Sequence, residues 1–199
     1  MTEAPQIDIN ARIASRVREL RAAQGVSLET LAARTGVSRS MISLIERGES
    51  SATAVLLERL SAGLGVALAS LFDAPAAERQ HSGPVARLAQ QPQWRDPASG
   101  YTRRNVSPGG VASPMQIVEV QFPPGARVAY ETGARGTRVH QQVWVLEGSI
   151  DVTLGTEVHR LKTGDCLAHV LDQPTAFHNP TRKPARYAVV LVSPTRSSA

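Results

Sequence analysis

The sequence is poor in the residues that cross-link or anchor a protein. It contains one cysteine, Cys166, among 199 residues, so no internal disulfide can form and no zinc cluster can be built from thiols. We expect Cys166 to be a small buried side chain in a reducing compartment. No apolar run approaches the roughly 18 residues that a membrane-spanning helix needs, and residues 1–10 lack the basic start and apolar core of a secretory signal. These absences predict a cytoplasmic protein with no membrane partner.

Net charge is also absent from the N-terminal part of the chain. Residues 1–74 contain eight arginines and eight acidic residues. Residues 75–199 contain fourteen basic and nine acidic residues, and so hold the whole net charge of +5. If the N-terminal part binds DNA, it must place single arginines and helix N-termini against phosphates, or bind as two copies.

Apolar residues recur at helical spacing from Ile9 to Leu71, which predicts helices throughout this region. Five helices fit the pattern. Glycines at positions 25, 48 and 65 end the first, third and fourth of them, and a short fifth helix covers residues 67–72.

Residues 28–47, LETLAARTGVSRSMISLIER, predict two short helices joined by a tight turn. Ser27 and Ser38 stand where an N-cap belongs, Ala32 is small enough for a close helix crossing, and Gly36 tolerates the positive φ of the turn. Apolar residues would then pack the second helix against the first and leave its other side exposed. The packing residues are Val37, Ile42 and Ile45, and the exposed residues are Arg39, Ser40, Ser43 and Leu44.

The stretches GVSRSMISLIERGE and LERLSAGLGVALASLF make residues 12–72 resemble the XRE family, the lambda-repressor-like helix-turn-helix domain. The resemblance implies double-stranded operator DNA as partner and, because the family mostly binds as symmetric dimers, a homodimer. It also implies three sets of site residues. They are the base contacts Arg39, Ser40, Ser43 and Leu44, the phosphate contacts Ser27, Leu28 and Ser38, and a structural ion pair between Arg21 and Glu46.

These positions are not equally informative. An arginine near the start of such a helix can fork to guanine, so Arg39 is the principal candidate. Ser40 and Ser43 could contact bases or be merely solvated. Leu44 could touch a thymine methyl group or a neighbouring helix, and the sequence does not decide between them.

After Asp73 the composition shifts to Pro, Ala, Gln and Ser, which indicates a linker and lead-in segment over residues 73–100. It separates a helical domain, residues 9–72, from a second domain, residues 101–193. In the second domain short apolar runs of period two predict an antiparallel barrel or sandwich. The predicted strands are 116–122, 142–146, 149–154, 164–170 and 186–192.

The stretches VWVLEG, residues 143–148, and GDCLAHVLDQPTAFHN, residues 164–179, resemble the two motifs of the cupin family, a small jelly-roll-like β-barrel. Metal-binding cupins hold a divalent ion with histidines and a glutamate. The corresponding positions here hold Gln141 and Thr175, and residues 134–137 contain no histidine. His140 and His178 stand beside these positions, but strand alternation turns them to the opposite face. We therefore expect no metal, no cofactor and no catalytic residue.

A small-molecule effector site is the remaining expectation for the barrel. Gln141, Thr175, Phe177 and Asn179 share the inward parity, and the segment before the barrel adds Tyr101, Arg103 and Arg104. With Arg135 and Arg138 near the first motif, these arginines could bind an anion through their bidentate forks. Alternatively they are solvated strand residues or partners of Glu119 and Glu131.

Together the two resemblances predict a sequence-specific DNA-binding transcription regulator. We expect a dimeric repressor, not an enzyme, whose metal-free cupin domain senses an unknown small molecule. Two alternatives stay open: a cupin enzyme with an accessory DNA-binding domain, and a cupin that serves only as a dimerisation module.

Overall fold

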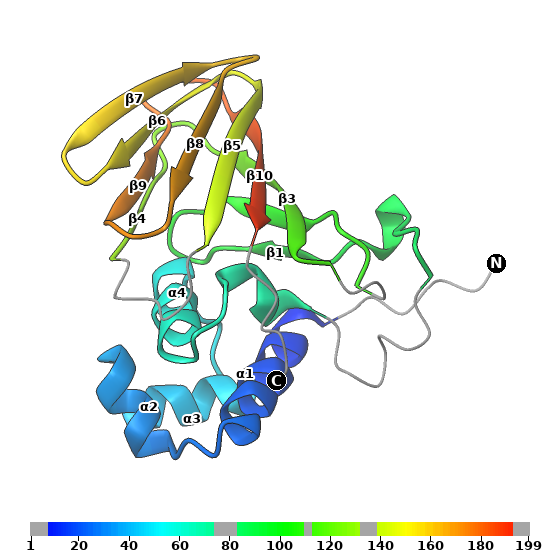
Figure 1. Ribbon diagram of the computed structural model, residues 1–199, viewed down its shortest axis with the longest axis vertical. Helices are drawn as coiled ribbons and strands as arrows, with labels where there is room; N and C mark the ends of the chain where they lie inside the picture. The colour runs from blue at the N-terminus through cyan, green and yellow to red at the C-terminus, as the bar shows by residue number, and fades with distance from the viewer. Residues whose placement is uncertain (1–7, 74–82, 110–112, 132–138, 193–199) are drawn as a thin grey trace.

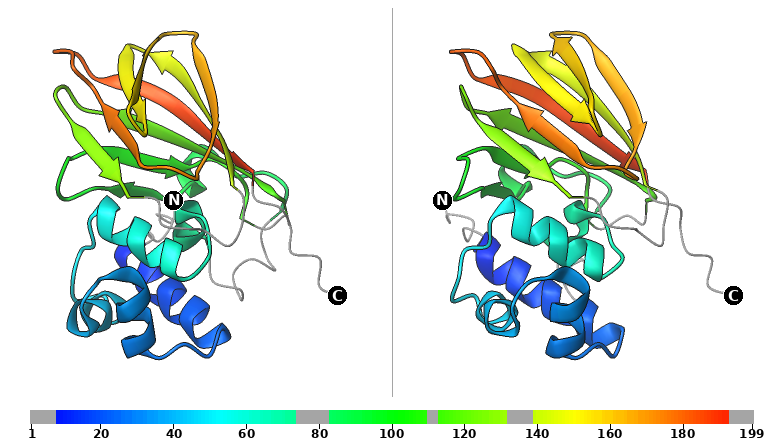
Figure 2. Two further views of the ribbon diagram at one scale, coloured as in Figure 1. Left: turned by 60° about the vertical axis from the view of Figure 1, so that its left-hand side comes forward. Right: turned by 90° about the vertical axis from the view of Figure 1, so that its left-hand side faces the viewer.

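The computed structural model describes residues 8–73, 83–109, 113–131 and 139–192. Helices form one end of the molecule and two β-sheets the other (Figures 1 and 2). The helices are α1 (Ile9–Ala23), α2 (Leu28–Thr35), α3 (Arg39–Glu46) and α4 (Ala54–Gly63), with two 3-10 turns, η1 (Leu68–Phe72) and η2 (Leu88–Gln90). The strands are β1 (Gln93–Arg95), β2 (Thr102–Asn105), β3 (Met115–Phe122), β4 (Arg127–Tyr130), β5 (His140–Glu147), β6 (Ser149–Leu154), β7 (Glu157–Lys162), β8 (Cys166–Val170), β9 (Thr175–His178) and β10 (Ala185–Val192).

Local hydrogen bonds set where the central helices begin and end. The side chains of Ser27, Ser38 and Thr53 accept backbone N–H groups at the starts of α2, α3 and α4. Gly36 ends α2 at φ 66°, in the left-handed region, and donates its N–H to the Ala32 carbonyl. The predicted caps and the predicted turn are therefore confirmed.

The predicted fifth helix is wrong as an α-helix, because residues 68–72 form the 3-10 turn η1. Five residues are too few for a stable α-helix, and packing decides their conformation instead. Ala69, Leu71 and Phe72 are all buried, and η1 lies against both α1 and α4. The tighter turn directs apolar side chains to more than one neighbour at once.

The C-terminal strands form two facing antiparallel sheets, a double-layered jelly-roll-like arrangement. One sheet has the order β1-β2-β3-β10-β5-β8 and the other β4-β9-β6-β7. Alternate residues such as Val118, Val143, Val152 and Phe177 are buried between them. No ladder among the described residues joins the two sheets. Of the two predicted arrangements, the barrel is therefore wrong and the sandwich is confirmed. The edge strands β1 and β4, with three and four residues, offer few backbone groups for closure.

Two further expectations differ from the structure. Cys166 is exposed instead of buried, because it is paired in register with Trp144 on the outer face of the larger sheet. The segment 73–100, predicted as linker and lead-in, contains β1, which pairs with β2. The sheet thus begins before residue 100.

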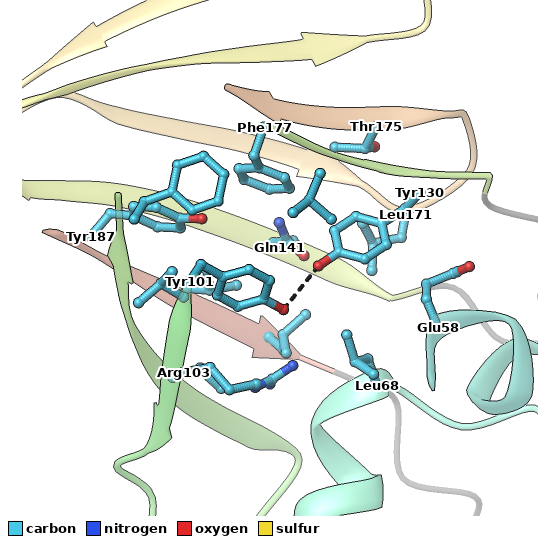
Figure 3. Close-up of a pocket in the computed structure, with 16 residues that line it drawn as sticks. Glu58, Leu68, Tyr101, Arg103, Tyr130, Gln141, Leu171, Thr175, Phe177 and Tyr187 are labelled. Carbon is cyan, nitrogen blue, oxygen red and sulfur yellow. Dashed lines mark hydrogen bonds between the residues drawn. The ribbon is translucent and has the colours of Figure 1, made fainter. Parts of the chain in front are cut away.

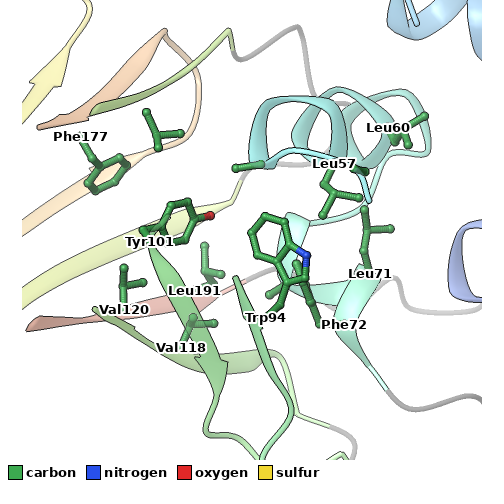
Figure 4. Close-up of a cluster of buried hydrophobic side chains, with 14 of the residues drawn as sticks. Leu57, Leu60, Leu71, Phe72, Trp94, Tyr101, Val118, Val120, Phe177 and Leu191 are labelled. Carbon is green, nitrogen blue, oxygen red and sulfur yellow. The ribbon is translucent and has the colours of Figure 1, made fainter. Parts of the chain in front are cut away.

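Helices and sheets share one continuous core (Figure 4). The Phe72 ring of η1 lies 5.5 Å from the Trp94 ring of β1, and Trp94 lies 5.9 Å from Tyr101. Polar contacts reinforce this joint: Asp96 Oδ1 accepts the Ala54 N–H of α4 at 2.9 Å. The helical end is therefore fixed against the sheets by packing and not only by the chain. None of the helices in the described ranges is long and apolar enough to cross a membrane.

Candidate functional site

Helix α3 lies with α2 at the end of the molecule remote from the sheets (Figure 1). Val37, Ile42 and Ile45 are buried beneath it. Arg39 and Ser40 are exposed, and Ser43 and Leu44 are partly exposed. The four predicted base-contact residues thus occupy the open side of α3, where the predicted amphipathic pattern puts them.

An ion pair anchors the far end of α3 to α1. Arg21 Nε and Nη2 donate to the two carboxylate oxygens of Glu46 at 2.6 and 2.9 Å, and these bonds raise the pKa of Arg21 above its ordinary value. Arg21 also donates to the Val26 carbonyl at 2.9 Å, while Arg18 donates to the Glu46 carbonyl. The two residues that the resemblance pairs are therefore together, and they hold α3 against α1.

Arg39 has little to hold it within the molecule. Its side chain is 67% exposed, and its ion pair with Glu29, across the turn, spans 3.9 Å. Exposed pairs of this length contribute little stability. The guanidinium at the start of α3 is consequently available to a partner.

The serines of the turn region are more constrained. Ser38 accepts the Met41 N–H at 3.2 Å and lies 3.1 Å from the Ser40 hydroxyl. Ser27 accepts the Thr30 N–H at 3.0 Å, and Leu28, which follows it, is half-buried. These are the predicted phosphate contacts, and they stand at the N-termini of α2 and α3, where backbone N–H groups favour an anion.

Arg47, which the sequence pattern did not single out, is exposed just after α3. It donates to both Glu49 carboxylate oxygens at 2.8 Å and to the Ser43 hydroxyl. The hydrogen bonds from Arg47 lower the pKa of Glu49. The charge of Arg47 is thus neutralised by Glu49. The Ser43 hydroxyl already accepts a hydrogen bond from Arg47.

A cavity of about 80 Å³ lies between the sheets, on the side where they meet the helical end. Figure 3 shows Tyr101, Gln141, Thr175 and Phe177 pointing into it. Two of its walls come from the helical end, Glu58 of α4 and Leu68 of η1. By the measure in which one water needs about 10–15 Å³, this volume accommodates several waters or one small organic molecule. The lining set is Glu58, Leu68, Tyr101, Arg103, Val118, Val120, Phe122, Val128, Tyr130, Gln141, Leu171, Thr175, Phe177, Tyr187, Val189 and Leu191.

Three tyrosines supply polar groups within this apolar lining. The hydroxyls of Tyr101 and Tyr130 are 3.2 Å apart. Burial raises the pKa of Tyr101 and, more strongly, the pKa values of Tyr130 and Tyr187. Burial thus disfavours the charged phenolate of each tyrosine and keeps the three hydroxyl groups able to donate a hydrogen bond.

Arg103 is the buried cation of the cavity. The residue is 6% exposed, and its guanidinium carbon lies 4.4 Å from the centre of the Phe72 ring. Its Nε is buried and has no hydrogen-bond partner in the part of the chain that the structure describes. Burying a guanidinium whose N–H group has no acceptor costs free energy. The site therefore favours a bound ligand that supplies an acceptor.

Two of the predicted effector-site residues lie elsewhere. Arg104 pairs with Glu119 at 2.7 Å on the outer face of the larger sheet. The Asn179 amide donates to the carbonyls of Phe122, Pro123 and Lys183 and organises the loop after β9. Because β9 ends at His178, strand alternation no longer positions residue 179. Arg135 and Arg138 lie outside the described residues.

The two positions that the motif resemblance aligned with metal ligands, Gln141 and Thr175, are buried on the cavity side. His140, by contrast, is exposed on the opposite face of β5. Within the described ranges, no three His, Cys, Asp or Glu side chains gather as a metal site would require.

Comparisons with known proteins agree with this geometry. A helix-turn-helix family model matches residues 17–71. The HTH-type transcriptional regulator SutR of Escherichia coli is 26% identical over 84% of this chain and 86% of its own length. The control protein C.MunI of Mycoplasma is 38% identical over 66 residues, which are 33% of this chain and 89% of that protein. The crystal structure of an HTH_3 family transcriptional regulator from Vibrio cholerae has a TM-score of 0.73 at 26% identity, and covers 94% of this chain and 97% of its own.

The chain is a helix-turn-helix transcriptional regulator. Its partner is therefore DNA. The likeness to the Vibrio cholerae regulator extends over helices and sheets alike, so the two-part architecture belongs to the regulator as a whole. Sequence reasoning missed three residues that connect the parts, Glu58, Leu68 and Phe72. An apolar helix pattern alone does not distinguish side chains that face a second domain from those that face their own core.

Proposed function

We propose that this regulator is a dimeric repressor that reads its operator with α3 and responds to a small molecule in the cavity. The proposal rests on one observation: the cavity is lined by residues of both parts of the molecule. Glu58 and Leu68 belong to the helical end, and the other lining residues belong to the sheet part. A ligand changes DNA affinity only if it binds the DNA-competent arrangement more or less tightly than the other. A ligand that touches both parts has the means to do so.

Arg39 is the proposed principal base contact. It is exposed at the start of α3, weakly tethered, and has the planar fork that matches guanine O6 and N7. Leu44 and Ser40 complete the reading side, with Ser43 more restricted by its bond from Arg47. Ser27, Leu28 and Ser38 are the proposed phosphate contacts, and they fix register without reading sequence.

A second copy supplies the DNA affinity that the neutral helical end lacks. On the outer face of the larger sheet, Trp144 is 50% exposed, and register pairing puts Met115 and Val192 on the same face. The nearby charges are balanced, because Glu119 bridges Arg104 and Arg186 and the latter also reaches Glu147. The three oxygen to nitrogen distances are 2.7, 3.8 and 3.7 Å. Two such faces can approach without repulsion, so we place the dimer contact here.

The sheet domain has a sensing role, not a catalytic one, in this proposal. The similar proteins reported above are regulators, and the cavity offers phenol, amide and guanidinium groups to a bound molecule. Since the proposed partner is operator DNA, we place the regulator in the cytoplasm.

Footprinting the purified protein on the DNA upstream of its own gene would define the operator. Arg39→Ala should weaken operator binding by about 1–3 kcal/mol and relax the sequence preference at one base position in each half-site. Arg160→Ala, an exposed arginine of β7 in the sheet domain, is the matched control and should bind as the wild type does. Unchanged affinity and preference in Arg39→Ala would show that α3 docks in another register.

A further inference from the structure

We infer that Arg103 binds a small monocarboxylate in the cavity and that the DNA-binding end registers this binding through the contact between Arg103 and Phe72. The inference rests on the proposed function and names both the ligand class and the residue that couples ligand to helices. Figure 3 shows Arg103 beneath the tyrosine pair, at the side of the cavity where Leu68 of η1 lies.

The chemistry of Arg103 selects an anion. Arg103 is 6% exposed as a residue, and its buried Nε has no acceptor. No ion pair between described residues includes it, and its contact with the Tyr101 hydroxyl is with a neutral group. The contact with the Phe72 ring compensates only part of the desolvation of the charge. A carboxylate would supply the missing acceptor through the bidentate geometry that arginine favours.

The rest of the lining favours a single negative charge on a small apolar body. The phenols of Tyr101 and Tyr130 can donate to the same carboxylate or to a polar group beside it. The other lining residues are mostly apolar, and Arg103 is the one basic side chain among the described residues of the lining. One guanidinium fork matches one carboxylate, and a cavity of about 80 Å³ leaves room for only a small body beside it.

A continuous set of contacts leads from Arg103 to α3. The Arg103 guanidinium lies over Phe72 of η1, and the Ser70 carbonyl of η1 accepts a hydrogen bond from Arg16 of α1 at 3.2 Å. Helix α1 in turn holds Glu46 of α3 through Arg21. A carboxylate that draws the guanidinium off the Phe72 ring changes the packing of η1, and η1 lies directly against α1 and α4. Ligand binding thereby biases the arrangement of the reading helix.

The test uses the full-length protein and matched pairs of probes: propionate with propionamide, butyrate with butyramide, and benzoate with benzamide, all at equal ionic strength. Two quantities are measured, the thermal midpoint and the affinity for the upstream DNA fragment. At least one carboxylate should raise the midpoint and change DNA affinity at least fivefold, the lower end of typical couplings. Its amide should do neither.

Variants separate ligand binding from coupling. Arg103→Met should lose both responses, and Arg103→Lys, which keeps the charge without the fork, should bind the carboxylate at least tenfold more weakly and serves if the methionine variant does not fold. Phe72→Leu should keep the thermal shift but lose most of the change in DNA affinity. Arg160→Met, on the exposed face of β7 and outside the cavity, should respond as the wild type does.

The inference is overturned if no carboxylate raises the midpoint, if Arg103→Met or Arg103→Lys responds fully, or if Phe72→Leu retains the full change in DNA affinity. A protein that binds carboxylate in an Arg103-dependent manner but binds no operator would instead overturn the proposed function. The thermal measurement needs no DNA, so the two failures are distinguishable.

Discussion

Arg39 on the reading helix and Arg103 at the joint between helices and sheets show two ways to use a guanidinium. Arg39 is 67% exposed and barely tethered, whereas Arg103 is 6% exposed and lies over an aromatic ring. A surface that meets a polyanion such as DNA benefits from a solvated charge that acts at a distance and adjusts on contact. A cavity that encloses a small molecule instead benefits from a desolvated charge with an unmet hydrogen bond.

The hydroxyl groups of the two regions differ in the same way. Ser27 and Ser38 cap helices at the surface, and their first role is to fix the start of a helix. The buried phenols of Tyr101 and Tyr130 pair with each other. The hydroxyl groups of the reading end therefore act within a few residues of sequence, whereas those of the cavity connect distant segments.

Phe72→Ala should have the largest effect, because it removes the ring that joins these two regions. Truncating a buried phenylalanine costs about 3–5 kcal/mol of unfolding free energy. Since the core is continuous from η1 to the sheets, chemical denaturation should show both ends losing stability. Far-ultraviolet circular dichroism reports the helices, and tryptophan fluorescence reports the sheets, where Trp94 and Trp144 lie.

The control for this variant is Leu88→Ala, at a side chain that is 68% exposed. It should change the unfolding free energy by no more than about 0.5 kcal/mol. A loss of stability in Phe72→Ala confined to the helical signal would mean that the two ends fold independently, and the shared core would not couple them.

Glu46→Gln should act on the reading end alone. It leaves Arg21 with a neutral partner, and since the Arg21 side chain is 20% exposed, we expect a loss of about 2 kcal/mol, below the range for a fully buried pair. DNA affinity should fall while the carboxylate-induced thermal shift is retained. The comparison variant Glu49→Gln breaks the exposed pair with Arg47 and should be as stable as the wild type.

Trp144→Glu should leave both ends intact within one chain and weaken only the pairing of two chains. A charge at the proposed contact should raise the dimer dissociation constant at least tenfold, about 1.4 kcal/mol, as measured by sedimentation equilibrium. Val158→Glu, at a side chain 53% exposed on β7 of the other sheet, should remain dimeric. If Val158→Glu dissociates and Trp144→Glu does not, the contact lies on the smaller sheet.

The helical end could be predicted closely because its signals are local. Ser38 caps α3 through a backbone group three residues away, and Gly36 turns the chain by its own φ. The ends of α1, α3 and α4 follow from similar short-range evidence. Only residues 68–72 differ from the prediction. Packing against α1 and α4 makes them a 3-10 turn, although their apolar pattern is typical of an α-helix.

The sheets were predicted less completely because their strands depend on distant partners. Strand β9 is buried at its first three residues and so lacks the alternation that marks a strand, while β7 is mostly exposed. In β2 the buried residue is Arg103, a type that normally indicates solvent. The cavity could be foreseen from Gln141, Thr175 and Phe177. Its wall from α4 and η1 could not, because residues 58–72 and 101–103 are brought together only by folding.

Asp96 has a consequence for exchanging domains between regulators. Its carboxylate, held from the other side by Ser99 at 2.9 Å, accepts the first N–H of α4. A helix-turn-helix segment excised after residue 73 would lose that acceptor and start α4 on the Thr53 cap alone. Chimeras that join this segment to a foreign sensor domain should therefore keep a stable α4 only when a strand or loop of that domain places a carboxylate at the position of Asp96. This one side chain makes the two modules less interchangeable than their separate folds suggest.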